Sequence, residues 1–166
     1  MRKLRKPVSV GLAGLALFVL TACGGASTSN QPAAVITPAC VNASAPNKAH
    51  VVVEHQSGTT VDRCVGFTTA KANGAGLMTA SGIDFKTQHF SFGDAACAID
   101  SEPASYSTCL PQGAPYWALW TSTGGGPWVM AQTGFAAVLV ANGDALGWRY
   151  TPSTETNPAP PPPAKK

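Results

Sequence analysis

The sequence predicts an α+β domain in which a small antiparallel β-sheet dominates and one short helix accompanies it. Three observations lead to this fold class. Apolar residues gather in short runs bounded by glycine, proline and polar residues, as is typical of strands. A single stretch has the composition and the end signal of a helix. The candidate domain, residues 40–151, holds four cysteines, an even number that suits a disulfide-bonded exported domain.

The first half of this domain predicts a strand, a helix and two shorter strands. Residues 49–56 contain three consecutive valines between polar ends, which favours a strand. Residues 69–81 predict the helix, with Gly82 as its C-cap. Gly74 and Gly76 weaken this helix, because each glycine in a helix interior costs about 1 kcal/mol. Two further short strands are expected at residues 88–92 and 96–100.

The second half predicts two hairpins. In the first, residues 115–121 and 127–132 pair around a glycine-rich loop whose glycines permit positive φ. In the second, residues 136–140 and 145–150 are joined by the tight turn Asn142-Gly143-Asp144. The strands of these hairpins complete the predicted sheet.

The four cysteines of the domain are expected to form two disulfides. Of the three pairings that are open, the sequential one, Cys40–Cys64 and Cys97–Cys109, closes the smallest loops. Loops of this size are each worth about 3 kcal/mol of stability. A zinc site is the alternative, but it needs closely spaced ligand pairs such as CxxC, and the sequence has none.

Residues 1–22 have the organisation of a secretory leader. The basic start MRKLRK precedes an apolar run, residues 8–20, which is shorter than the about 20 residues of a membrane span. The run leads into Leu20-Thr21-Ala22-Cys23, which resembles the lipobox of bacterial lipoproteins. This resemblance implies that Cys23 is lipidated, becomes the mature N-terminus and anchors the chain to the membrane. The alternative is an ordinary signal peptide with a stray cysteine.

Two segments flank the candidate domain. Residues 23–39 are rich in glycine, serine, threonine and proline, and they predict a flexible tether. Residues 152–166 include NPAPPPPAKK, which predicts a disordered tail of polyproline II character. Alternatives for this tail are a spacer that crosses the cell wall and a ligand for a proline-binding module.

The charge balance argues against nucleic acid as a partner. The formal net charge is +3, but residues 1–22 hold four of the 11 basic residues and none of the eight acidic ones. Without the leader the chain therefore carries a net charge of −1, which removes the argument from a basic patch.

A set of motifs in the second half has a recognisable order. It comprises CAID at residues 97–100, PYWALW at 115–120, GGGPW at 124–128 and NGDALGWRY at 142–150, preceded by a helix that ends at Gly82-Ile83. Over residues 49–151 this plan resembles the C-terminal domain of transcobalamin and intrinsic factor, which also occurs alone in bacterial surface proteins. The resemblance implies a β-grasp-like fold and a cobalamin-like ligand. The large helical domain that completes the vertebrate cobalamin site is absent. The resemblance therefore supports the fold of this domain more strongly than it supports cobalamin as the ligand.

Aromatic residues are the main chemical feature of this half. They are Tyr116, Trp117, Trp120, Trp128, Trp148 and Tyr150. On a strand, Tyr116, Ala118 and Trp120 share one face, and Trp117 and Leu119 share the other. One face should build the core, and the other is a candidate stacking platform for a small ligand or a protein. The candidate ligand-binding residues are Tyr116, Trp117, Trp120, Trp128 and Trp148. The alternative is that cross-strand aromatics only stabilise the sheet.

No constellation of residues predicts catalysis, a cofactor or a metal site. His50 and His55 are an odd number of residues apart and so point to opposite faces of a strand, and His89 is expected to be a scattered histidine. Asp100 and Glu102 are expected to be solvated turn residues. The sequence has no P-loop, G-x-S-x-G elbow or dinucleotide-binding fingerprint in a suitable context.

Together these observations predict a non-enzymatic lipoprotein on the extracytoplasmic face of the cell membrane. Its expected work is the capture of a cobalamin-like or other small molecule for an importer, or the docking of a partner protein. The competing hypothesis is a structural or adhesive module of the cell envelope that has no small-molecule ligand.

Overall fold

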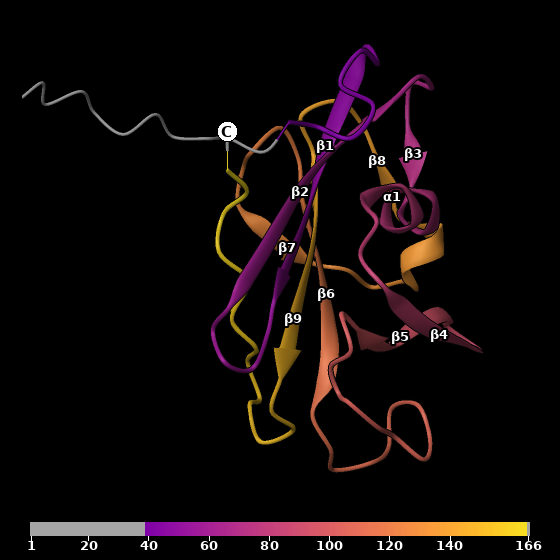
Figure 1. The fold of residues 1–166 in the computed structure, drawn as a ribbon. Helices are drawn as coiled ribbons and strands as arrows, with labels where there is room; N and C mark the ends of the chain where they lie inside the picture. The colour runs from indigo at the N-terminus through magenta and orange to yellow at the C-terminus, as the bar shows by residue number, and fades with distance from the viewer. Residues whose placement is uncertain (1–38, 166) are drawn as a thin grey trace, which may run out of the picture. The chain divides into compact units, whose positions relative to one another are not determined.

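The computed structural model describes residues 39–165 and has a small sheet-dominated domain with one α-helix, as the α+β prediction requires (Figure 1). The main sheet has five strands in the order β2-β1-β9-β6-β7. Their bounds are β1 Asn47–Glu54, β2 Thr60–Phe67, β6 Tyr116–Ser122, β7 Trp128–Met130 and β9 Ala145–Thr151. The leader, Cys23 and the tether up to residue 38 lie outside the described residues.

Two short strand pairs and two helical elements complete the fold. β3 (Ala72–Asn73) pairs with β8 (Leu139–Val140), and β4 (Phe85–Phe90) pairs with β5 (Gly93–Ile99). The helices are α1 (Gly74–Ser81) and the 3-10 helix η1 (Phe135–Ala137). None of the helices within residues 39–165 is long and apolar enough to cross a membrane.

The sheet is not purely antiparallel, which corrects the sequence-based prediction. β1 and β9 pair in parallel, with His50 opposite Ala145 and Glu54 opposite Arg149. A parallel pair needs a long crossover connection. The chain between these two strands supplies it, because β1 is the first strand in the sequence and β9 is the last.

The second predicted hairpin is also wrong. Residues 139–140 pair with β3, whereas β9 joins β1 and β6 in the centre of the sheet. The turn at residues 142–144 does form, and the Asp144 carboxylate accepts the N–H groups of Ala141 and Gly124. A central position buries both faces of β9, and six of its seven residues are buried. Strand β2 is not among the predicted strands, because its sequence lacks a continuous apolar run.

Helix α1 is shorter than predicted because Asn73 begins it. The Asn73 side chain accepts the N–H of Gly76 at 2.7 Å, and Gly82 at φ 72° ends the helix as predicted. Gly74 lies in the first turn, where the carbonyl of Phe135 leaves no room for a Cβ. This glycine therefore allows the helix to approach η1, and its missing side chain is a packing requirement.

The core lies between α1 and one face of the main sheet. Trp148 is 2% exposed, its ring centroid is 5.5 Å from that of Phe135, and its indole N–H donates to the sulfur of Met78 at 3.2 Å. Leu77 and Met78 bring α1 to the same cluster. We call this face of the sheet the inner face and the opposite one the outer face.

Both predicted disulfides are present. Cys97 is joined to Cys109 and Cys40 to Cys64, with Cα–Cα distances of 4.8 and 4.5 Å. The second of these ties the chain entering the domain to β2. Beside it, the Val41 N–H donates to the Cys64 carbonyl, and the Gly66 N–H donates to the Val41 carbonyl. The entering chain thus lies along the free edge of β2.

The C-terminal segment, residues 152–165, packs on the outer face, whereas its composition predicts a disordered tail (Figure 1). Pro161 is less than 2% exposed. Arg149 donates to the carbonyl of Ala159, and the N–H of Lys165 donates to the Asp62 carboxylate. The composition of a proline run shows that it forms no internal hydrogen bonds. The composition does not show that side chains on the sheet can hydrogen-bond to its backbone.

Asp62 makes this packing sensitive to acid. Burial raises the pKa of Asp62, but hydrogen bonds from His50 and from the Lys165 N–H outweigh burial and bring the pKa below its ordinary value. Such a carboxylate adds to the free energy of unfolding. This stabilisation is complete above the pKa of the group in the unfolded chain, and it is lost as the pH falls through the lower pKa of the group in the folded protein. We expect Asp62→Asn to cost about 1 kcal/mol at about pH 6. The cost should vanish near pH 2.

Urea unfolding of the two proteins at both pH values measures this difference. Asp84→Asn serves as the control, because the exposed Asp84 side chain also loses one charge. A cost of Asp62→Asn that persists near pH 2 would contradict the assignment.

Candidate functional site

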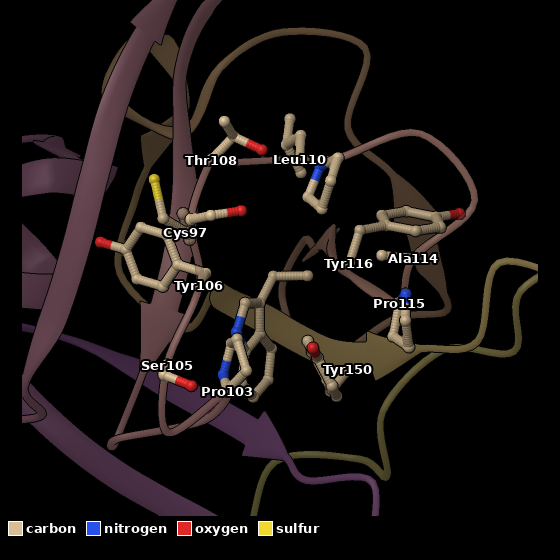
Figure 2. Close-up of a pocket in the computed structure, with 14 residues that line it drawn as sticks. Cys97, Pro103, Ser105, Tyr106, Thr108, Leu110, Ala114, Pro115, Tyr116 and Tyr150 are labelled. Carbon is tan, nitrogen blue, oxygen red and sulfur yellow. The ribbon is translucent and has the colours of Figure 1, made fainter.

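A cavity of about 530 Å³ opens beside the start of β6 (Figure 2). Tyr106 and Tyr116 stand on opposite sides of it, and Tyr150 of β9 forms its floor. Trp117 also lines it, together with serine, threonine, proline and small apolar residues. None of the described residues that line this cavity carries a charge.

The loop between β5 and β6 forms one wall of the cavity. The Cys97–Cys109 disulfide attaches this loop to β5. At the start of the loop, Asp100 and Ser101 take positive φ values of 48° and 64°, and Ile99 and Glu102 exchange two backbone hydrogen bonds of 2.9 Å. Leu110, which lines the cavity, has φ 52°.

These left-handed conformations favour glycine, yet all three residues carry side chains. Such strain persists only where the surrounding structure fixes it, and it gathers at binding sites. Of the three residues, Leu110 lines the cavity itself.

Two aromatic side chains that pack against each other, Trp117 and Tyr150, also line the cavity. Trp117 and Tyr150 have ring centroids 5.0 Å apart, and the indole N–H of Trp117 donates to the Glu102 carbonyl at 2.8 Å. Burial, and after it the Glu102 carboxylate, raises the pKa of Tyr150 above its ordinary value. Like any tyrosine, Tyr150 is protonated at neutral pH, and the raised pKa extends this neutral state to more alkaline pH.

His55 supports the loop from outside the cavity. Its Nδ1 lies 2.8 Å from the Glu102 carboxylate, and its Nε2 lies 3.4 Å from that of Asp100. The His55 ring also meets Trp117 edge-on, with centroids 5.8 Å apart. The expectation that Asp100 and Glu102 are merely solvated turn residues is therefore wrong for Glu102, which is fixed between His55 and the backbone of Gln56.

No local signal pairs His55 with Glu102, because 47 positions separate them and only the fold brings them together. His50 pairs with Asp62 instead, which agrees with the prediction that the two histidines point to different sides. Within residues 39–165, no group of three or more His, Cys, Asp or Glu side chains is arranged to hold a metal ion.

The structure divides the five candidate ligand-binding residues among different places. Tyr116 and Trp117 line the cavity. Trp148 lies in the core and lines a neighbouring cavity of about 320 Å³, which shares Tyr116 and Trp117 with the first. Trp120 and Trp128 belong to the outer face, because they pair in register with Gly147 and Ser122.

The predicted alternation along β6 separates Trp117 from Trp120, but Tyr116, which is expected on the face of Trp120, lines the same cavity as Trp117, and no open platform forms. Trp117 joins the core cluster, and Trp120 on the other face is also buried, at 8% exposed. Tyr106, which sequence reasoning missed, is 43% exposed at the mouth of the cavity. It lies in a loop without periodicity, so only its place inside the disulfide-closed segment could have suggested a role.

No family model and no curated protein matches the chain. Among solved structures, the chain is similar to the crystal structure of a putative metal binding protein from Ruminococcus gnavus ATCC 29149, with 16% sequence identity and a TM-score of 0.47. The similarity covers 64% of this chain and 97% of that chain. At this level it carries no argument about the ligand of this protein.

Proposed function

We propose that this chain is a non-enzymatic, membrane-anchored exported protein that captures a neutral, ring-containing small molecule in the Tyr106–Tyr116 cavity. One observation carries the proposal: an uncharged cavity of about 530 Å³ combines aromatic faces with hydroxyl groups. The lipobox-like Leu20–Cys23 supports the anchoring, and the two disulfides suit an oxidising compartment outside the cytoplasm.

The chemistry of the lining selects the class of ligand. Aromatic rings bind flat or ring-shaped molecules through area and stacking, while tyrosine, serine and threonine hydroxyls bond polar edges. A charged ligand would lose its hydration without gaining a counter-charge from the lining, and this loss is costly. A neutral ring with amide or hydroxyl substituents therefore fits best.

The resemblance to the C-terminal domain of transcobalamin supports a corrinoid within this class. The five-stranded sheet with a parallel central pair and one helix on its inner face supports a β-grasp-like domain. A corrinoid is larger than the cavity, so one amide-bearing edge of the ring would enter between Tyr106 and Tyr116 and the remainder would stay exposed. Delivery of such a molecule to an importer would use this exposed part.

Replacement of the cavity aromatics tests the proposal. In a chain that carries Cys23→Ser, we expect calorimetry to detect micromolar binding of cobinamide or cobalamin. Tyr116→Ala and Tyr106→Ala should each weaken this binding about tenfold, because each removes one stacking wall. Trp128→Ala is the matched control and should leave binding unchanged, since Trp128 does not line this cavity.

Equal losses for Trp128→Ala and Tyr116→Ala would place the ligand elsewhere. If neither corrinoid binds, a neutral disaccharide and indole serve as the next probes of the same cavity. The absence of heat with all four probes would remove ligand capture and favour the structural or adhesive module.

A further inference from the structure

The C-terminal segment contacts the outer face with a repeat of three residues. Pro161 is less than 2% exposed, and Pro158 and Ala164 are half-buried, while most residues between them are exposed. Each proline ring fixes φ, and each following proline holds the preceding residue extended, so the run forms a polyproline II helix. This helix has three residues per turn. One edge of it therefore lies along the sheet.

Gly147 of β9 provides the position on which Pro161 rests. A Cβ added to Gly147 would lie 2.7 Å from the Cγ of Pro161 and 2.8 Å from the ring of Trp128, so a larger residue does not fit. Pro161 and Trp128 thus meet above Gly147. A proline ring packed beside an aromatic ring is the contact by which many domains recognise proline-rich peptides.

The polar contacts of the segment go mainly to its backbone. Arg149 donates to the Ala159 carbonyl at 3.2 Å, and Asp62 accepts the Lys165 N–H at 2.6 Å. Arg149 also bonds Glu155 at 2.8 Å, next to the point where the segment meets the sheet. Backbone contacts of this kind would hold any extended segment that has prolines at the right spacing.

Two features of the outer face remain unfilled by the segment. The indole N–H of Trp120 is buried and has no acceptor among the described residues. Ala164 also lines a cavity of about 420 Å³, together with Trp128 and the glycines at residues 124–126, and His50 and Asp144 stand at the same cavity. The methyl group of Ala164 is too small to fill it. A larger side chain at this position would fit better than the one that the chain itself supplies.

We propose that the outer face is a docking site for a proline-rich segment of another protein, and that residues 158–165 occupy this site in cis as a competitor. The partner's segment has polyproline II conformation and a large apolar side chain three residues after the proline that rests on Gly147. Such a segment fills the cavity beside Trp128, which the cis segment leaves empty. Release of the cis segment is then the event that opens the site.

Two synthetic peptides and two full-chain variants test this proposal. The peptides carry residues 155–165, one with the native sequence and one with Ala164→Leu. The first variant, Pro158→Gly with Pro161→Gly, weakens cis docking, and the second adds Gly147→Leu to block the site. All chains carry Cys23→Ser, and calorimetry measures binding.

The native peptide should bind the Pro158→Gly, Pro161→Gly chain at least about tenfold more tightly than the chain with its native tail, because the native tail occupies the site. The Ala164→Leu peptide should bind this open chain more tightly than the native peptide does. Added Gly147→Leu should abolish both interactions. A matched peptide with glycine in place of Pro158 and Pro161 should not bind.

Three results would overturn the proposal. One is a folded Pro158→Gly, Pro161→Gly chain that binds neither peptide, and another is binding that Gly147→Leu leaves unchanged. The third is formation of dimers by tail exchange in preference to peptide binding, which would make a second copy of the chain the occupant.

A second measurement covers the case in which the double glycine variant does not fold. In the chain with its native prolines, Ala164→Leu should fill the cavity in cis, raise the midpoint of thermal unfolding and weaken binding of the Ala164→Leu peptide. An unchanged or lower midpoint would show that the cavity does not accept the larger side chain, and the proposal would fail.

Discussion

Replacing Trp148 by alanine is expected to lower the free energy of unfolding by about 3–5 kcal/mol. Trp148 is 2% exposed and packs against Phe135, and its indole N–H reaches the sulfur of Met78. Two terms make up this loss: the free energy of transferring a large aromatic ring from water to the core, and the cost of the cavity that alanine leaves. Because β9 is held between β1 and β6, it has little freedom to move and close this cavity. Because small domains have only about 5–15 kcal/mol of stability, this variant should lie near its unfolding threshold at 37 °C.

Denaturant unfolding followed by circular dichroism measures the loss. Leu139→Ala is the control for removal of an apolar side chain, because Leu139 is 59% exposed and should change the stability by less than about 0.5 kcal/mol. Similar losses for the two variants would mean that Trp148 does not lie at the centre of the core.

Removal of the Cys97–Cys109 disulfide should abolish ligand binding in addition to lowering stability. With Cys97→Ala and Cys109→Ala, we expect a loss of about 3 kcal/mol, because the unfolded chain is no longer constrained. The loop that carries Tyr106 and Leu110 would also be released from β5. Without the disulfide, the left-handed residues at the start of this loop have less to hold them, and the cavity loses its wall.

The Cys40–Cys64 disulfide gives the matched comparison. Cys40→Ala with Cys64→Ala should cost a similar amount of stability, but it should keep corrinoid binding, because neither residue lines the cavity. Calorimetry on both double variants, at a temperature where both remain folded, separates the two effects. If both variants bind equally well, the disulfide-closed loop does not shape the site.

The parts of the fold that sequence predicts are those fixed by neighbours along the chain. Three valines mark β1, Gly82 marks the end of α1, and a glycine-rich loop marks the β6–β7 hairpin. The disulfide pairing belongs to the same class, since the smallest loops are also the ones that formed. In each of these cases a short-range preference and the final fold agree.

Pairings between distant strands could not be predicted in this way. The turn at residues 142–144 has the sequence of a hairpin turn, yet β9 gains more by pairing with β1 and β6 than with the residues just before it. Burial on both faces of a central strand outweighs the local preference. Sequence periodicity predicts which residues are buried, but it does not predict which strand pairs with them.

The candidate site shows the same limit. Tyr116, Trp117 and Tyr106 all line the cavity. The first two could be predicted because they belong to a strand rich in aromatic residues, whereas Tyr106 lies in a loop without a periodic pattern. The contact of His55 with Glu102 and the docking of Pro161 on Gly147 both depend on the completed sheet. An aromatic count identifies residues that bind rings, but it does not separate those that line a cavity from those covered by the chain itself.

The chain that enters along β2 has a consequence for aggregation. β2 is an outermost strand of the main sheet, and an open edge of this kind invites edge-to-edge growth with another molecule. Val41 forms hydrogen bonds with two backbone groups of β2, the Cys64 carbonyl and the Gly66 N–H, and the Cys40–Cys64 disulfide holds Val41 beside them. The opposite edge is β7, which is only three residues long. Both edges of the main sheet are therefore restricted as routes to intermolecular sheet growth.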